Sequence, residues 1–302
     1  MNYLVTGATG FIGRKLVAQI AARPGSTITY LARKRSPNLP GIAMFQSWGT
    51  GEIPSLEAVP PPDVVFHLAG EPIAQRWTPE VKQRLYSSRV DGTRSLVAAL
   101  RALNKRDITL VSASATGYYG DRGNEILTET SKPGDDFLAR LCVDWEREAS
   151  SARAAGFRVV PVRISVVFGP NGGALPKMLE PFRMGLGAKF GSGRQWMSWI
   201  HVDDLVKLML LAADRPELNG PLNGSSPEPV TNAEFTKTLG GIIHRPAFLS
   251  APRALMRLAL GEMAEFLFAS QRVVPEATQE AGFQFAYPNL RHALAACLRA
   301  DT

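Results

Sequence analysis

Cysteine and histidine are scarce in this sequence, and no long apolar run is present. The two cysteines, Cys142 and Cys297, lie far apart, which excludes a disulfide framework and a cysteine-built zinc site. The four histidines show no metal-ligand spacing, so no metal is expected. No apolar run approaches the ~18 residues that a membrane helix needs, and residues 1–6 lead straight into a glycine-rich turn without a signal peptide. We therefore expect a cytoplasmic protein with no membrane partner.

The composition is that of an ordinary globular protein with a moderate excess of positive charge. With 302 residues, 45% hydrophobic and 20% charged, the chain can form one large domain or two unequal ones. Its 34 Lys and Arg residues against 27 Asp and Glu residues give a net charge of +7. These basic residues are spread without a dense run or a recognisable nucleic-acid-binding module. The sequence therefore favours a small-molecule substrate over a nucleic acid as the partner.

The N-terminus carries the most informative pattern, an apolar strand followed by a G-x-x-G-x-x-G turn and an amphipathic helix. In such a turn the first glycine permits a sharp bend, the second lets a pyrophosphate approach the backbone, and the third lets the helix pack on the strand. The helix N-terminus offers free N–H groups to the phosphates. The pattern therefore predicts a dinucleotide site, with these residues as cofactor contacts: Gly7, Thr9, Gly10, Phe11, Ile12 and Gly13.

The residues after the second predicted strand distinguish the two nicotinamide cofactors. An NAD site places an acidic residue about 20 residues past the glycines, where it binds the ribose 2′-OH. Here Arg33 occupies that position, followed by Lys34 and Arg35, and no acid is nearby. A guanidinium can fork onto a 2′-phosphate. We predict NADP(H), with Arg33 and Lys34 as contacts; a solvated basic loop is the alternative.

Apolar runs alternate with helical patterns through the first half of the chain, which is typical of a parallel α/β sheet. Strands are predicted at 27–31, 43–46, 63–68, 108–112 and 157–163, and long helices at 79–103 and 137–155. Pro161 indicates that its strand lies at a sheet edge or in an irregular ladder. We predict an α/β, doubly wound parallel-sheet Rossmann fold with a smaller, mostly helical C-terminal substrate lobe.

The boundary between the two parts is expected near residue 225. Residues 1–225 form the predicted cofactor domain, except that the glycine-rich stretch 171–197 contributes to the substrate lobe formed by 226–302. The apolar residues from Met256 to Phe268 are expected to be core rather than pocket lining. The two long helices suit a four-helix dimer interface, and a monomer is equally compatible with the chain.

Ligands of open parallel sheets bind at the carboxyl ends of the strands, so the residues that follow each strand are candidate contacts. Small residues after the strand at 63–68 permit a close approach to the cofactor. Arg89, one turn from Thr93 on the following helix, is expected either to bind phosphate or to brace the strand ends. The cofactor contacts predicted from these segments are Leu68, Ala69, Gly70, Glu71, Arg89, Ser112 and Val167.

A cluster of hydroxyl groups follows the strand at 108–112 and is the candidate catalytic segment. Ser114, Thr116, Tyr118 and Tyr119 could polarise a substrate carbonyl or alcohol beside the nicotinamide, or cap backbone groups. Further on, the run from 199 to 205 predicts a strand that breaks into a helix. Its Asp203 and Asp204 stand where helix N-caps usually lie, and we favour a capping role for them over catalysis.

Together these segments resemble the extended short-chain dehydrogenase/reductase superfamily. The closer similarity is to its atypical, epimerase-family branch, whose members carry the label nucleoside-diphosphate-sugar epimerase and a C-terminal domain of unknown function. The matching segments are 6–13, 66–73, 88–93, 112–120, 144–146, 181–187, 199–205, 222–224, 231–235, 260–265, 270–275 and 281–283. The resemblance implies an NADP(H)-binding Rossmann domain and hydride transfer to or from a small polar substrate, nucleotide-linked or not.

The resemblance also exposes a gap in the catalytic apparatus. Active members use a tyrosine as the general acid and base. Four residues later on the same helix, a lysine holds the nicotinamide ribose. Aligned on 145–146, these positions hold Leu138 and Cys142, whereas Ser114 fits the family's serine.

Three alternatives follow from this gap. Tyr118 or Tyr119 replaces the missing acid, assisted by the charge of Arg122 or Arg140. Alternatively, a substrate group or a water serves as the acid. In the third case no chemistry occurs, and the chain is a non-catalytic NADP(H)-binding regulator or sensor.

Overall fold

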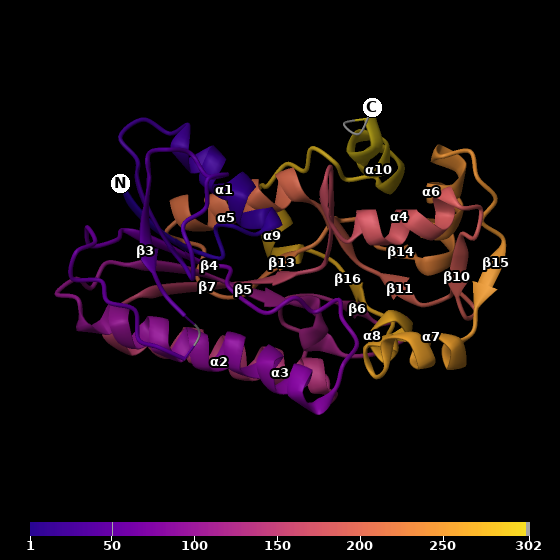
Figure 1. The fold of residues 1–302 in the computed structure, drawn as a ribbon, viewed down its shortest axis with the longest axis horizontal. Coiled ribbons are helices and arrows are strands. Elements are labelled where there is room, and N and C mark those ends of the chain that lie inside the picture. Colours follow the sequence, from indigo (N-terminus) through magenta and orange to yellow (C-terminus); the bar gives the residue numbers. More distant parts are fainter. Residues whose placement is uncertain (50, 300–302) are drawn as a thin grey trace.

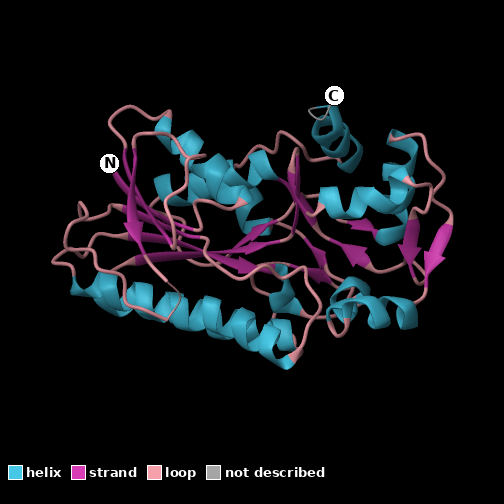
Figure 2. Ribbon diagram, in the orientation of Figure 1, coloured by secondary structure: helices cyan, strands magenta, loops and turns pink. Residues whose placement is uncertain are grey.

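The computed structural model, which describes residues 1–49 and 51–299, is built on a seven-stranded parallel sheet with the order β13-β7-β5-β4-β1-β2-β3 (Figures 1 and 2). Its strands are β1 (Asn2–Thr6), β2 (Thr27–Ala32), β3 (Ala43–Ser47), β4 (Val64–His67), β5 (Thr109–Ala115), β7 (Arg158–Ile164) and β13 (Leu222–Gly224). Every neighbouring pair runs parallel. The predicted doubly wound Rossmann fold is confirmed.

Helices cover both faces of this sheet. In Figure 1, α1 (Phe11–Ala21) and α5 (Val202–Asp214) lie above it, and α2 (Pro79–Ala102) and α3 (Phe137–Ser150) lie below it. Thr78 caps α2 by accepting from the Val81 N–H at 3.3 Å, and Asp136 caps α3 by accepting from the Ala139 N–H at 2.8 Å. These caps satisfy first-turn N–H groups that lack helical partners.

A second apolar core lies beyond the C-terminal ends of the strands. Its centre is an aromatic stack in which the Phe168 ring lies 6.1 Å from the Trp199 ring and 5.5 Å from the Phe235 ring. The elements around it are β8 (Val166–Gly169), β9 (Gly172–Gly173), α4 (Leu175–Arg183), β12 (Trp199–His201), α6 (Asn232–Ile242) and α10 (Leu290–Arg299).

Short elements complete this part of the molecule. They are η1 (Thr116–Tyr119), β6 (Ile126–Leu127), β10 (Ala188–Phe190), β11 (Trp196–Met197), β14 (Val230–Thr231), β15 (Leu249–Ala251), α7 (Arg253–Leu260), α8 (Met263–Phe268), β16 (Arg272–Val273) and α9 (Glu276–Glu280). By contrast, η2 (Ser151–Ala155) joins α3 to the start of β7 and packs in the core of the seven-stranded sheet. None of the helices within 1–49 and 51–299 combines the length and the apolarity needed to cross a bilayer.

The packing tests three local predictions and corrects two of them. β7 lies between β5 and β13, but β13 pairs only with residues 162–164, so Pro161 stands in an irregular ladder, which is one of the two predicted alternatives. The N-cap of α5 is His201, whose ring accepts from the Asp203 N–H, so the two aspartates lie in the first turn instead. Met256 is not core, since α7 buries none of its residues and leaves Leu258 71% exposed.

Candidate functional site

The glycine turn at the end of β1 contains two glycines that the fold requires and a third, Gly10, that is far less closely surrounded. Gly7 has φ +69°, and a Cβ there would lie 2.6 Å from the Leu68 carbonyl. A Cβ on Gly13 would lie 2.2 Å from the Gly7 oxygen, so α1 packs on the turn only with glycine there. Gly10 is exposed, and a Cβ there would meet only the Gly7 oxygen, at 3.2 Å. Its missing side chain therefore leaves space on the outer side of the turn.

The first turn of α1 contains no acidic side chain and is not capped by any side chain of the described residues. Gly10 is the N-cap residue. The first N–H groups and the positive end of the helix dipole are therefore available to an anion. The space at Gly10 and these free donors fit a dinucleotide pyrophosphate.

The ring of Phe11 anchors this helix end to the segment after β7. Cβ atoms on Gly169, Gly172 and Gly173 would lie within 3.0 Å of that ring. Three glycines thus make room for one aromatic side chain, which brings Val167 of β8 to the same end of the sheet. Close packing on Phe11 thus explains three of the glycines at the start of this glycine-rich stretch.

A buried histidine, overlooked at the level of sequence, supports the loop after β4. Thr6 Oγ1 lies 2.7 Å from His67 Nδ1 and also accepts from the N–H groups of Leu68 and Ala69 at 3.1 Å each. His67 Nε2 lies 2.8 Å from Thr93 Oγ1. Burial lowers the pKa of His67 to about 4, so the ring is neutral. The chain of bonds holds residues 68 and 69 against Gly7.

Arg33 and Lys34 lie at the predicted edge of this site. The register pairs Thr6 with Leu31, so the residues that follow β2 emerge beside the glycine turn. Both side chains are exposed. Their contact with a ribose 2′-phosphate stays a prediction, and their exposure leaves both side chains accessible to a ligand.

Neither Ser112 nor Ser114, at the end of β5, has a free hydroxyl group, because each donates a hydrogen bond within the protein. Ser114 Oγ donates to Glu146 Oε1 at 2.6 Å, and Ser112 is fully buried with its Oγ near the Ala113 carbonyl at 3.3 Å. Glu146 is held in turn by the Arg163 guanidinium through two bonds of 2.9 and 3.0 Å. The sequence reading missed both charged residues; an arginine within the apolar run 157–163 was the available signal.

The two tyrosines of η1 have different surroundings. Tyr119 is fully buried; its hydroxyl donates to Asn223 Oδ1 at 2.7 Å and accepts from Arg163 at 3.0 Å. Burial raises the pKa of Tyr119 to about 12. Tyr118 is half-buried, and its hydroxyl has no hydrogen-bond partner in the part of the chain that the structure describes. Tyr118 is therefore the tyrosine whose hydroxyl is free to meet a substrate.

The cation beside these tyrosines is also not the expected one. The Arg163 guanidinium lies 3.5 Å from the centre of the Tyr118 ring. Arg122 instead forms a fork with Glu125 at 2.6 and 2.9 Å, and Arg140 is exposed on α3. Thr116 is buried in the same turn.

Leu138 and Cys142 face the end of β5, as the alignment on 145–146 implies. The Leu138 side chain lies 3.2 Å from where Gly117 would carry a Cβ. Burial raises the pKa of the Cys142 thiol to about 12, although hydrogen bonds to Ala115 and Ser114 oppose this shift. Two uncharged groups therefore occupy the helix face where a tyrosine and a lysine would act.

A cavity of about 470 Å³ is lined in part by the loop that follows η1 in the chain. Asp121 and Asn124 line one side, and Arg194, Trp196 and Phe268 line the others. Its walls combine aromatic rings with a guanidinium, and Arg194 has no carboxylate partner within 1–49 and 51–299. Over the same residues, no cluster of His, Cys, Asp and Glu could hold a metal ion.

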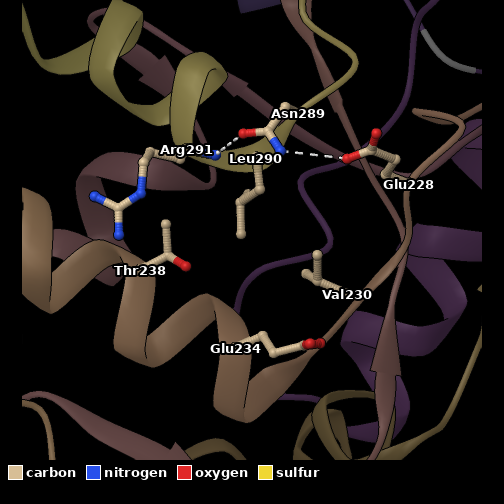
Figure 3. Close-up of a pocket in the computed structure, with 7 residues that line it drawn as sticks. All are labelled: Glu228, Val230, Glu234, Thr238, Asn289, Leu290 and Arg291. Carbon is tan, nitrogen blue, oxygen red and sulfur yellow. Dashed lines mark hydrogen bonds between the residues drawn. The ribbon is translucent and has the colours of Figure 1, made fainter.

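A second cavity, of about 310 Å³, lies between α6 and α10 (Figure 3). Two of its polar side chains already serve the local structure. Glu234 forms a capping box with Thr231, and Asn289 accepts from the Arg291 N–H at 3.0 Å and bonds to Glu228 at 3.3 Å. Because these side chains stabilise helix ends, we assign this cavity no catalytic role.

Comparison with known proteins agrees with this geometry. Residues 3–223 match the NAD dependent epimerase/dehydratase family, and residues 251–297 match a domain of unknown function, DUF1731. The chain is 38% identical to the chloroplastic epimerase family protein SDR39U1 homolog of Arabidopsis thaliana, over 99% of this chain and 87% of that protein. It is 36% identical to the epimerase family protein YfhF of Bacillus subtilis, over 97% of both.

A solved structure shares the whole architecture. The human epimerase family protein SDR39U1, crystallised with NADPH, superposes with a TM-score of 0.86 at 33% identity and covers 99% of both chains. A nucleoside-diphosphate sugar epimerase from Corynebacterium glutamicum gives a TM-score of 0.79 at 34% identity, over 99% of this chain and 58% of that one.

Proposed function

The chain belongs to the NAD dependent epimerase/dehydratase family, and from this premise we propose that it binds NADP(H) and catalyses hydride transfer on a small polar substrate. The observation that carries the proposal is the open, uncapped N-terminus of α1 at Gly10. The human relative, similar over the whole chain, was crystallised with NADPH.

The preference for NADP(H) over NAD(H) rests on the charges after β2. Arg33 and Lys34 are exposed beside the glycine turn, and no acidic residue takes the place that a ribose 2′-OH would require. A guanidinium binds a phosphate group through charge-assisted, bidentate hydrogen bonds.

The cavity after η1 is the proposed substrate site. Residues 1–225 would bind the cofactor, while 171–197 and 226–302 would hold the substrate. The unpaired Arg194 suits an anionic group, and the rings of Trp196 and Phe268 suit a flat, nucleobase-like group. A nucleotide-linked substrate combines both features.

Bound NADP(H) would supply or accept the hydride. A side chain of the protein would then have to donate or accept the accompanying proton. Tyr118 offers a hydroxyl with no hydrogen-bond partner among the described residues and is the proposed acid, in place of a tyrosine at position 138. Ser114 commits its hydrogen to Glu146, so it can only accept a hydrogen bond from a substrate hydroxyl. Thr116 is buried and Tyr119 is already bonded, so both support the turn.

A second candidate function is supported by the helix face at Leu138 and Cys142. Since neither side chain can transfer a proton near neutral pH, the chain could bind NADP(H) without turnover and act as a sensor.

Calorimetric titration with NADPH and NADH tests the proposal, followed by a screen for NADPH oxidation with carbonyl compounds and nucleotide sugars. Tight NADPH binding with turnover supports the enzyme. Binding without turnover of any substrate supports the sensor, and failure to bind either cofactor overturns both.

A further inference from the structure

Arg89 of α2 extends beneath the loop that follows β4. Its guanidinium donates to the Glu71 carbonyl at 3.0 Å and to the Leu85 carbonyl at 3.3 Å. A Cβ on Gly70 would lie 3.3 Å from its Cζ, so glycine there lets the loop cover the guanidinium. Arg89 thus lies directly under two residues expected to line the cofactor.

The charge of Arg89 has no counter-charge bonded to it. Within 1–49 and 51–299 no carboxylate pairs with it; the Glu71 carboxylate lies 3.7 Å from Arg84 and bonds to Gln75 instead. Arg163, a buried arginine near the site, is by contrast paired with Glu146, whereas Arg89 is half-buried. Removing a cation from water without an anion is costly, and burial lowers the pKa of Arg89 accordingly. An anion from outside the chain would remove this cost.

The same cation lies beside the helix face that lacks a lysine. The Cζ of Arg89 is 5.3 Å from the centre of the Trp145 ring on α3. Trp145 follows Cys142 by three residues, so the two share one helix face. The Arg89 charge acts on the Cys142 thiol, whose pKa it lowers against the larger effect of burial. The cation of α2 therefore lies next to position 142, where the family resemblance places a lysine.

We propose that Arg89 supplies, from α2, the cation that a lysine at position 142 would supply from α3, and that it holds the nicotinamide ribose and its adjoining phosphate. This inference rests on the proposed binding of NADP(H). A guanidinium does not give up its proton in proteins, so Arg89 holds the cofactor and takes no part in proton transfer.

Relocation of the charge tests the proposal. Arg89→Gln should weaken NADPH binding by about 10- to 100-fold, the usual cost of losing a charged hydrogen bond. Arg89→Gln combined with Cys142→Lys should recover most of that loss, because the cation returns from the neighbouring helix. Arg94→Gln, which removes an exposed guanidinium of α2, is the matched control and should bind NADPH as the wild type does.

The readouts are NADPH affinity by calorimetry and the melting temperature without cofactor. A purely bracing role for Arg89 would lower the melting temperature, and Cys142→Lys would not restore affinity; that result overturns the proposal, as does unchanged affinity in Arg89→Gln. If Arg89→Gln does not fold, labelling of wild-type Arg89 by phenylglyoxal replaces it. Protection by NADPH supports the proposal, and equal labelling with and without NADPH overturns it. A wild-type protein that binds no NADPH refutes the proposed function instead.

Discussion

Ser114 at the end of β5 donates its hydroxyl hydrogen to Glu146 of α3 across 2.6 Å. This bond extends an ion pair, because Glu146 also accepts two bonds from Arg163 of β7. The central sheet and α3 are thus joined by a buried polar network directly below the candidate site. It determines which way the Ser114 hydroxyl points and so what that hydroxyl can do.

Glu146→Gln should destabilise the fold by about 3–5 kcal/mol, since it leaves the Arg163 cation buried without a partner. Glu148→Gln is the matched control on the same helix. Its partner Arg94 is exposed, so the loss should stay below about 1 kcal/mol. Urea denaturation of both variants measures the difference, and equal losses would show that the buried pair contributes no more than the surface pair.

Gly10→Ala should lose cofactor affinity, whereas Gly13→Ala should lose stability. At Gly10 the new Cβ approaches only the Gly7 oxygen, at 3.2 Å, and enters the space that the pyrophosphate would take. This variant should keep its melting temperature and lose affinity for both NADPH and NADH. At Gly13 the Cβ lies 2.2 Å from the Gly7 oxygen, so about 2 kcal/mol or more of stability should be lost. Unchanged cofactor affinity in Gly10→Ala would mean that the turn serves the fold alone.

Arg33→Asp should weaken NADPH binding by about 10- to 100-fold and leave NADH binding nearly unchanged, because only NADPH carries the 2′-phosphate. Arg35→Asp is the control, since it makes the same charge change two residues further on. Calorimetric titration with both cofactors separates direct contact from general surface potential. Equal weakening of NADPH and NADH by Arg33→Asp would contradict the assignment.

Tyr118→Phe and Tyr119→Phe should separate chemistry from stability. Loss of the Tyr118 hydroxyl leaves no partner unsatisfied and should lower turnover by about 10²- to 10⁴-fold with the stability unchanged. Loss of the Tyr119 hydroxyl leaves Asn223 and Arg163 without their bonds and should cost about 1–3 kcal/mol. The comparison requires kcat with an identified substrate and the free energy of unfolding. Full activity in Tyr118→Phe would exclude it as the acid.

His67 should make the protein sensitive to mild acid. The folded ring binds a proton only below about pH 4, whereas the unfolded ring does so below its ordinary pKa of 6.5. Between these values the unfolded state binds more protons, so about 3 kcal/mol of stability should be lost as the pH falls through this window. His67→Gln should flatten that slope, and His244→Asn, at an exposed position with φ 53°, should not. Urea midpoints measured from pH 7 to pH 4 provide the comparison.

The parallel sheet, the glycine turn and the basic residues after β2 could be predicted because their signals are local. Strand and helix periodicity, glycine spacing and the residue after a strand are all read from neighbouring positions. The resemblance located positions 138 and 142 for the same reason, since they lie at a constant offset from 145–146. The predicted N-cap of α5 was wrong, because the ring of His201, and not an aspartate carboxylate, accepts the first-turn hydrogen bond, from the Asp203 N–H.

Local sequence patterns suffice for the Rossmann architecture and the position of the cofactor turn, because backbone periodicity and turn geometry depend on residues that are close in the chain. Packing alone establishes that Ser114 donates to Glu146, that Tyr119 is bonded and Tyr118 is not, and that Arg89 is half-buried without a carboxylate partner among the described residues. Each of these relationships joins elements that lie far apart in sequence. Which polar groups meet, and which remain unpaired, depends on how strands and helices pack against one another.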